Sequence, residues 1–387
     1  MNEPLKRPGE VLLDLAGRRR RGKGATVGHS TLGTLKIGGF EASLPIIQGG
    51  MGVGISLSSL ASAVAEEGGI GTIAAVGIGM FEPDIYTNFI EANVRALKKE
   101  IRKAREKTKG LLAVNIMVAM SNYAEMVKAA IEEKIDFIIS GAGLPLDMPK
   151  HLTEGCQTKL IPIVSSARAA AIICKRWLDK YGYAPDAMVV EGPLAGGHLG
   201  FKLEEISDPA HALEKLIPEV AETAKRFEAK AGKAIPVIAA GGVYTGADIL
   251  KFQKLGASGV QMATRFVTTR ECDASDVFKQ SYIDAGKEDL TIIKSPVGLP
   301  GRAIRNAFTE AAEGGKKAPF KCPYHCIITC DYQKAPYCIA LALVNAQRGN
   351  LGSGFAFAGS NAYRAKEIIS VKQTVDAIRQ EYAEAAG

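Results

Sequence analysis

The feature that most constrains the fold of this chain is a repeated alternation of short apolar runs with helical stretches. Short apolar runs bounded by turns or helices are typical of parallel strands that are buried on both faces. Eight such runs follow one another: Pro45–Gln48, Gly71–Val76, Leu112–Met117, Asp136–Ser140, Ile161–Ser165, Ala187–Glu191, Pro236–Ala240 and Gly259–Ala263. The helical stretches between them include Leu57–Glu67, Pro83–Lys107, Tyr123–Lys134, Ala167–Tyr181, Asp208–Lys230 and Thr245–Leu255.

Eight strand and helix alternations favour one closed architecture. An open doubly wound sheet would more often stop at five or six strands, whereas eight units close naturally into a ring. We therefore predict an α/β fold, a TIM (β/α)8 barrel.

The chain is longer than a barrel alone requires. It has 387 residues, against roughly 250 for a typical (β/α)8 barrel. After the eighth run the alternation stops, and residues 295–361 are rich in Gly, Pro, Cys and aromatic side chains. We predict a basic amino-terminal arm (residues 1–40), the barrel (41–290), a small cysteine-rich lid or subdomain after strand eight (291–370) and a carboxy-terminal helix (371–387).

The charge of the chain is modest, and much of its excess lies near the start. Lys and Arg number 48 against 41 Asp and Glu, a formal charge of +7, and Arg18–Arg21 form one run. We interpret this run as a solvated arm, with contact to an anionic surface as the alternative. Because no stretch approaches the roughly 18 unbroken apolar residues that a membrane span needs, we expect a cytoplasmic protein with neither membrane nor nucleic acid as a partner.

Two of the first strands end in residues suited to a planar polar ligand. In a barrel the carboxyl ends of the strands form the active site, so their following residues are interpreted together. Gln48, Gly49, Gly50 and Met51 follow the first strand, where the glycines permit close approach of backbone to a ligand and Met51 offers a polarisable contact. Asn115 ends the third strand with an amide that both donates and accepts hydrogen bonds.

The sixth strand ends in the candidate for the chemistry. Residues 191–200 read Glu-Gly-Pro-Leu-Ala-Gly-Gly-His-Leu-Gly. Small residues, Ala195 and Gly196 among them, leave one carboxylate, Glu191, and one imidazole, His198, with open space around them. The other four histidines lack this setting, so we predict that His198 is the catalytic residue.

The last two strands indicate a phosphate site. Gly241 and Gly242 follow strand seven ahead of a helix, and Met262, Ala263 and Thr264 end strand eight. In barrels the loops after strands seven and eight commonly bind phosphate through backbone N–H groups and a helix amino terminus.

Taken in order, these motifs resemble the nitronate monooxygenase (2-nitropropane dioxygenase) family and its relatives, the flavin-dependent enoyl-acyl-carrier-protein reductases. The similar pieces are Gln48-Gly-Gly-Met, Asn115, the Ala-Gly-Gly-His core of residues 191–200, Ala240-Gly-Gly-Val and Ala263-Thr-Arg-Phe. The resemblance implies a barrel that binds FMN, with His198 as the acid, base or substrate-orienting residue. The residues it implies in FMN contact are Gln48, Gly49, Met51, Asn115, Glu191, Ala195, Gly241, Gly242, Ala263 and Thr264.

A cysteine segment beyond the barrel is not part of that resemblance. Cys322, Cys326, Cys330 and Cys338 have C-x3-C-x3-C-x7-C spacing. Four thiolates suffice for a [4Fe–4S] cluster or a tetrahedral zinc, but zinc sites more often show paired knuckles separated by a longer insert. We predict a [4Fe–4S] cluster, with zinc and metal-free reduced cysteines as alternatives.

Three functions follow as hypotheses. The favoured one is an FMN-dependent oxidoreductase that oxidises alkyl nitronates or related small activated substrates. The second is an NAD(P)H-dependent enoyl-thioester reductase, carrying an iron–sulfur cluster and fed by NAD(P)H or an electron-transfer protein. The third is a non-catalytic barrel that binds a phosphate ligand. We leave the oligomeric state open, with a homodimer as one alternative.

Overall fold

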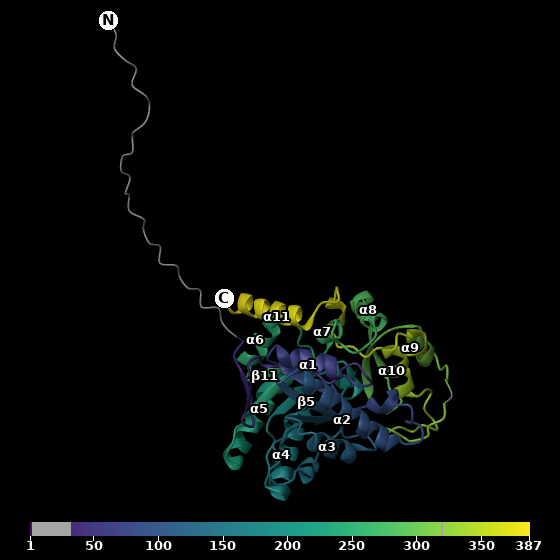
Figure 1. Cartoon of the computed structure of the whole chain (residues 1–387), viewed down its shortest axis with the longest axis horizontal. Coiled ribbons are helices and arrows are strands. Elements are labelled where there is room, and N and C mark those ends of the chain that lie inside the picture. Colours follow the sequence, from purple (N-terminus) through teal and green to yellow (C-terminus); the bar gives the residue numbers. More distant parts are fainter. Residues whose placement is uncertain (2–31, 319) are drawn as a thin grey trace.

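The computed structural model describes Met1 and residues 32–318 and 320–387. The Arg18–Arg21 run lies outside the described residues. Helices surround a central ring of strands, and a smaller group of elements lies to one side of it (Figure 1).

The ring is a closed barrel of parallel strands, which confirms the predicted fold class. Each strand pairs with the next, and β11 returns to pair with β3. The strands are β3 (Ile46–Gln48), β4 (Ile70–Ala74), β5 (Leu111–Met117), β6 (Phe137–Gly141), β7 (Lys159–Val164), β8 (Met188–Glu191), β10 (Val237–Ala240) and β11 (Gly259–Met262). All eight coincide with predicted runs.

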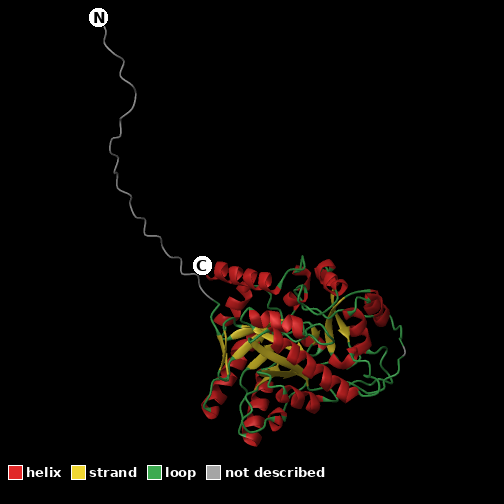
Figure 2. Ribbon diagram, viewed as in Figure 1, coloured by secondary structure: helices red, strands yellow, loops and turns green. Residues whose placement is uncertain are grey.

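Helices follow the strands around the outside of the barrel (Figure 2). They are α1 (Ser58–Glu66), α2 (Phe89–Lys107), α3 (Tyr123–Glu132), α4 (Ala167–Tyr181), α5 (Leu213–Ala231) and α6 (Gly246–Lys254). Two begin later than predicted. The backbone carbonyl of Asp84 accepts hydrogen bonds from the N–H groups of Thr87 and Asn88 in a turn ahead of α2. Ala212, with ψ of 142°, is extended at the start of α5.

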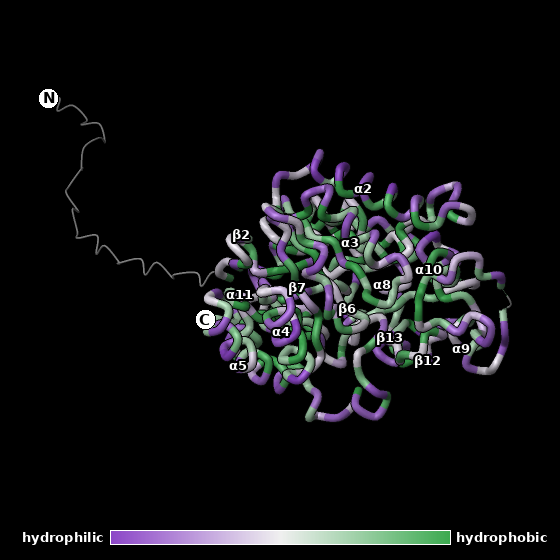
Figure 3. Tube along the Cα trace, turned by 90° about the horizontal axis from the view of Figure 1, so that it is seen from below, coloured by the Kyte–Doolittle hydropathy of each residue, from purple (hydrophilic) through white to green (hydrophobic). Residues whose placement is uncertain are grey.

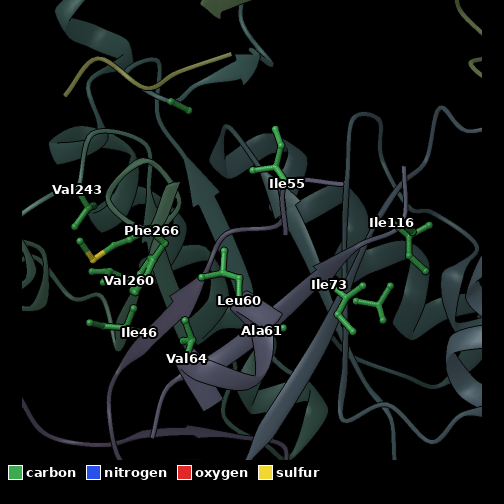
Figure 4. Packing of buried hydrophobic residues seen from close by; sticks show 14 of the residues in the cluster. Ile46, Ile55, Leu60, Ala61, Val64, Ile73, Ile116, Val243, Val260 and Phe266 are labelled. Carbon is green, nitrogen blue, oxygen red and sulfur yellow. The ribbon is translucent and has the colours of Figure 1, made fainter. Parts of the chain in front are cut away.

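The core has two layers because the strands alternate side chains between their faces. Ile47, Ala113, Phe137 and Ile238 belong to a cluster inside the barrel. Residues of the other face pack against the helices, as Figure 4 shows for Ile46 and Val260 with Leu60, Val64 and Phe266. This burial on both faces explains why the strands are continuous apolar runs. Along the chain, hydrophilic segments gather at the periphery (Figure 3).

A hairpin closes one end of the barrel. The strands β1 (Leu35–Ile37) and β2 (Phe40–Ala42) pair antiparallel, and their buried residues join the interior cluster. Phe40 meets Phe137 edge to face, with ring centroids 5.3 Å apart. Residues 35–37, which fall within the predicted arm of residues 1–40, alternate apolar and polar side chains as a half-buried strand does.

The segments after β11 form a cap at the other end. They include α7 (Thr264–Val267), α8 (Asp276–Asp284), β12 (Leu290–Lys294), β13 (Pro300–Ile304), α9 (Ala307–Glu313) and α10 (Ile339–Gln347). The strands β12 and β13 make a small sheet with β9 (Gly197–His198), which lies in the loop after barrel strand β8. Figure 2 shows this sheet apart from the barrel strands. The sheet thereby fixes the predicted catalytic loop to the cap.

The last helix, α11 (Val371–Ala386), packs on α6 at the barrel wall. Glu381 accepts hydrogen bonds from the Gly246 backbone at 2.9 Å and from Arg265 at 2.8 Å. The helix is therefore part of the barrel's outer layer. Among the helices described here, none is long and apolar enough to cross a membrane.

Candidate active site

A cavity of about 310 Å³ lies at the carboxyl ends of the barrel strands, under the cap. The barrel loops supply most of its wall, and the cap supplies Tyr282, Val297, Ile339, Ala340, Leu343 and residues 326–327 and 357–361. Twelve of the predicted site residues line it: Gly49, Gly50, Met51, Asn115, Glu191, Ala195, Gly196, His198, Gly241, Gly242, Ala263 and Thr264. The barrel thus brings into one space residues that lie far apart in the sequence.

Two predicted cofactor residues, Gln48 and Met262, lie outside the lining. Both are buried. The Gln48 carboxamide accepts the Thr72 N–H at 2.9 Å and donates to the Gly49 carbonyl, and the Met262 carbonyl accepts the Gly49 N–H at 2.9 Å. The side chains of Gln48 and Met262 point away from the cavity because each residue ends a strand and packs behind the loop that follows it. Their role is to hold the Gly49 backbone in place.

The glycine loops leave a cradle that side chains would fill. A Cβ at Gly50 would lie 2.4 Å from the Asn115 Cβ, and one at Gly241 would lie 2.7 Å from the Gly192 carbonyl oxygen. Gly241 and Gly242 have φ of +87° and +94°, a region that strains other L residues. The wall of the cavity is therefore backbone at these positions.

The cap closes the end of the cavity near Gly242 and Thr264. Asn361 donates its side-chain N–H to the Gly242 carbonyl at 2.7 Å, and the Gly359 N–H reaches the Thr264 hydroxyl at 3.2 Å. None of the lining residues in the described part of the chain is Lys or Arg. Nearby Arg265 instead bonds Glu381 and the Tyr244 carbonyl. An anion here would be held by backbone N–H groups and hydroxyls.

Glu191 contributes a carboxyl group to the cavity from the end of β8. The side chain is half-buried, but its exposed part faces the cavity, and this burial raises its pKa to about 7. The raised pKa means that the group changes charge near neutrality.

His198 is held by the cap. Its Nε2 and the Ser295 hydroxyl are 2.7 Å apart, and its ring meets Phe357 edge to face with centroids 4.9 Å apart. Its backbone lies opposite Gly301 of β13. His198 lines the cavity, and burial lowers the pKa of its imidazole to about 4. The imidazole is therefore neutral at physiological pH.

Several residues of the site were missed from the sequence. Ser295, Phe357 and Asn361 come from the cap, and Gln261 lines the cavity from β11. The Gln261 carbonyl oxygen Oε1 is buried and has no hydrogen-bond partner among residues 32–318 and 320–387. For Gln261 a signal existed, because it lies directly before the predicted phosphate turn. For Phe357 and Asn361 no local pattern could have indicated that they would face the cavity.

The cavity fits a flavin nucleotide. The Gln261 oxygen is a buried acceptor that needs a donor, the Asn115 amide lies beside the glycine cradle, and the backbone of Gly241 and Gly242 is open at one end. A ligand with a flat ring that carries N–H donors, and with a phosphate group at its other end, would match all three of these features.

The four cysteines of the cap segment are free and half-buried. Cys326 lines the cavity. Within residues 32–318 and 320–387, no three His, Cys, Asp or Glu side chains are arranged to hold a single metal ion.

Comparisons with known proteins agree with this geometry. A probable nitronate monooxygenase of Bacillus subtilis is 27% identical, and the match covers 88% of this chain and 97% of that protein. A hydroxy-methyl-oxo-octahydroindene-carboxyl-CoA dehydrogenase of Mycobacterium tuberculosis is 29% identical over 71% of this chain but only 66% of its own length.

Solved structures give the same result. FabK from Thermotoga maritima is similar with a TM-score of 0.66 and 30% identity, covering 88% of this chain and 93% of that one. A nitroalkane oxidase from Streptomyces ansochromogenes has a TM-score of 0.69 at 22% identity, which supports the fold alone. The model of the family described as nitronate monooxygenase matches residues 34–381. This chain therefore belongs to the nitronate monooxygenase family of flavin-dependent oxidoreductases.

Proposed function

We propose that the cavity binds FMN and that His198, anchored by Ser295, holds a small alkyl nitronate against the flavin for oxidation. The FMN phosphate would lie at Gly241, Gly242, Ala263 and Thr264. Asn115 and Gln261 would meet the polar edge of the flavin ring, and Glu191 would accept from a ribityl hydroxyl. FMN, when bound, would take up the electrons that the substrate loses.

The observation that carries the proposal is the neutral, anchored imidazole of His198 inside the cavity. A neutral imidazole offers one donor and one acceptor nitrogen, and the Ser295 contact at 2.7 Å leaves the other nitrogen for substrate. The negative charge of a nitronate favours the protonated ring, so its binding would raise the pKa of His198 from about 4. The residue would thereby orient the anion and share a proton with it.

The test is a comparison of His198→Ala with His151→Ala, a matched control outside the cavity. We expect His198→Ala to retain bound FMN and lose about 10²- to 10⁴-fold in nitronate turnover, the usual contribution of a positioned acid or base. The control should keep both. Full turnover in His198→Ala would refute the assignment, whereas loss of FMN would refute the placement of the residue at the substrate side.

A second candidate function is reduction of an enoyl thioester with NAD(P)H. The matched regions of FabK and of the CoA-thioester dehydrogenase favour it, as does an apolar extension of the cavity that Met80, Phe89 and Leu343 line. Anaerobic mixing with NADH or NADPH separates the two. Bleaching of the flavin absorbance would favour the reductase, because nitronate oxidation needs no nicotinamide.

The other predictions from the sequence concern the class of function, the cellular location, the oligomeric state and the domain limits. Membership of an enzyme family rules out the non-catalytic barrel as the function. A cytoplasmic location stays a proposal; the seven cysteines are all free, which fits a reducing compartment. The homodimer and the domain limits also stay predictions.

A further inference from the structure

Arg302 is a cationic side chain of the cap to which the proposed function gives no role. It lies on β13 opposite Gly197 of β9, and its neighbour Gly301 lies opposite His198. The side chain is half-buried, and burial lowers the pKa of its guanidinium. An Arg side chain stays protonated in proteins despite such a shift. A fixed positive charge therefore lies beside the loop that carries the predicted catalytic histidine.

Two backbone carbonyls hold the guanidinium in place. Its Nη2 donates to the Pro193 carbonyl at 2.8 Å, and its Nε donates to the Ala195 carbonyl at 3.2 Å. Within residues 32–318 and 320–387, no Asp or Glu forms an ion pair with Arg302. Carbonyl oxygens satisfy N–H donors but leave the net charge of the guanidinium in place. Arg302 therefore fixes two carbonyls of the loop and keeps a charge that no carboxylate neutralises.

The loop that Arg302 holds lies between the guanidinium and the cavity. Leu194, Ala195 and Gly196 line the cavity, whereas Arg302 does not. A second contact with the cap fixes the loop further, since the Ser360 N–H donates to the Leu194 carbonyl at 3.1 Å. Arg302 thus contacts the outer side of a loop whose inner side faces the cavity.

Peptide geometry then sets the direction of one N–H group in this loop. A trans peptide is planar, so its N–H and its C=O point in opposite directions. The Ala195 carbonyl points outward to Arg302, and the Gly196 N–H of the same peptide therefore points to the cavity side. Among the described residues, no backbone or side-chain group accepts this N–H. The loop consequently offers the cavity a donor two positions before His198.

An anion in the cavity would need such a group. No Lys or Arg lines the cavity within the described ranges, and His198 is neutral at physiological pH because burial lowers its pKa to about 4. The positive charge of Arg302 lies directly behind the peptide that carries the Gly196 N–H. A hydrogen bond accepted by a carbonyl polarises its peptide and strengthens the N–H at the other side as a donor.

We propose that Arg302 is a positioning residue that directs the Gly196 N–H into the cavity and stabilises a small anion bound there beside His198. The inference rests on the proposed function in so far as it takes the nitronate to be the anion of the reaction. Arg302 and His198 then have separate tasks. Arg302 lowers the free energy of the negative charge, and His198 supplies the hydrogen bond and the proton.

The experiment compares Arg302→Gln with Arg302→Lys in the full chain loaded with FMN. Both replacements keep an N–H donor for a carbonyl, but only lysine keeps the charge. The probes are nitrite, a small planar anion, and nitroethane in its neutral form. Each dissociation constant is measured anaerobically from the change in flavin absorbance.

The two variants should differ for the anion alone. We expect Arg302→Gln to weaken nitrite binding about tenfold and Arg302→Lys to stay within about threefold of wild type, as for one charge interaction in a protein. Neither variant should change nitroethane binding. Arg305→Met is the matched control, because Arg305 is an exposed arginine directly after β13, and it should equal wild type for both probes.

FMN content and the thermal melt report on the fold of each variant. The proposal is overturned if Arg302→Gln weakens nitrite and nitroethane equally, because Arg302 would then only shape the cavity. It is also overturned if Arg302→Lys weakens nitrite as much as Arg302→Gln does, if neither variant weakens it, if either variant loses FMN, or if the wild-type chain binds no nitrite. If the wild type oxidises no nitronate but the nitrite results hold, the proposed function fails and the role of Arg302 stands.

Discussion

Replacement of Gly241 by alanine should separate the backbone phosphate site from the rest of the FMN site. Gly241 has φ of +87°, where an L residue costs about 1–2 kcal/mol. The new Cβ would also lie 2.7 Å from the Gly192 carbonyl oxygen and 3.0 Å from the Gly192 nitrogen. Both are backbone atoms, so the contact cannot be relieved by a side-chain rotation. The loop between β10 and α6 must move.

The movement should appear as lost FMN affinity. In the variant without FMN the loop relaxes and loses its strain, and FMN binding must restore the strained loop or forgo a hydrogen bond. A hydrogen bond to a charged group contributes about 1.5–3 kcal/mol. Whichever of the two costs applies, the loss is about 1–3 kcal/mol, which raises the dissociation constant about 5- to 140-fold at 1.4 kcal/mol per factor of ten.

The assay is a titration of the FMN-free protein with FMN, followed by flavin fluorescence. Gly232→Ala is the matched control. Its φ is +66° and no atom lies within 4 Å of the added Cβ, so it should lower the free energy of unfolding by about 1 kcal/mol and leave FMN affinity unchanged. Unchanged affinity in Gly241→Ala would refute the phosphate assignment. Equal weakening in Gly232→Ala would refute the local argument.

Two further predictions concern stability. Burial raises the pKa of Glu191 to about 7 and lowers that of His198 to about 4. In the FMN-free protein, Glu191 therefore increases the stability of the fold as pH falls from about 7 toward the pKa that this carboxyl has in the unfolded chain. His198 decreases the stability as pH falls below the pKa that its imidazole has in the unfolded chain. Glu191→Gln should leave only the second effect, so its melting temperature should rise more steeply between pH 5 and 6.5 than that of wild type; parallel profiles would contradict this. In Gly246→Ala the added Cβ would lie 2.2 Å from the Tyr382 nitrogen and 2.3 Å from the Ile378 oxygen. We expect it to destabilise the fold by about 1–3 kcal/mol by displacing α11, measured by urea unfolding, and an unchanged midpoint would show that α11 tolerates the shift.

The barrel could be predicted because its signal is local and repeated. Each strand is buried on both faces, so Ile46 and Ile47 are both apolar even though one faces the helices and the other the interior. Helix starts were less predictable. The residues before α2 are compatible with a helix, and the turn at Asp84 arises from its specific hydrogen bonds to Thr87 and Asn88. The hairpin of β1 and β2 was missed because its strands have three residues each.

The backbone part of the cavity wall was also predictable, since glycines at the carboxyl ends of barrel strands allow the positive φ seen at Gly241 and Gly242 and leave the backbone open to the cavity. Which side chains face the cavity was harder. Gln48 and Met262 end the right strands, but the direction of each side chain depends on the pleat of its strand. Ser295 lies 97 residues from His198 in the sequence. Nothing in the local sequence around either residue indicates that contact.

The distribution of the site between barrel and cap has a consequence for substrate choice. The proposed FMN-binding residues lie mainly on barrel loops, whereas His198 is held by β13, Ser295 and Phe357 of the cap. The apolar extension is likewise completed by Leu343 of the cap. A change at Ser295, Phe357 or Leu343 would therefore alter the space above the proposed flavin site and leave in place the contacts of Asn361 and Gly359 with Gly242 and Thr264. Under the proposed function the cap would therefore carry the choice between nitronate and thioester, and it is also the segment in which the four cysteines lie.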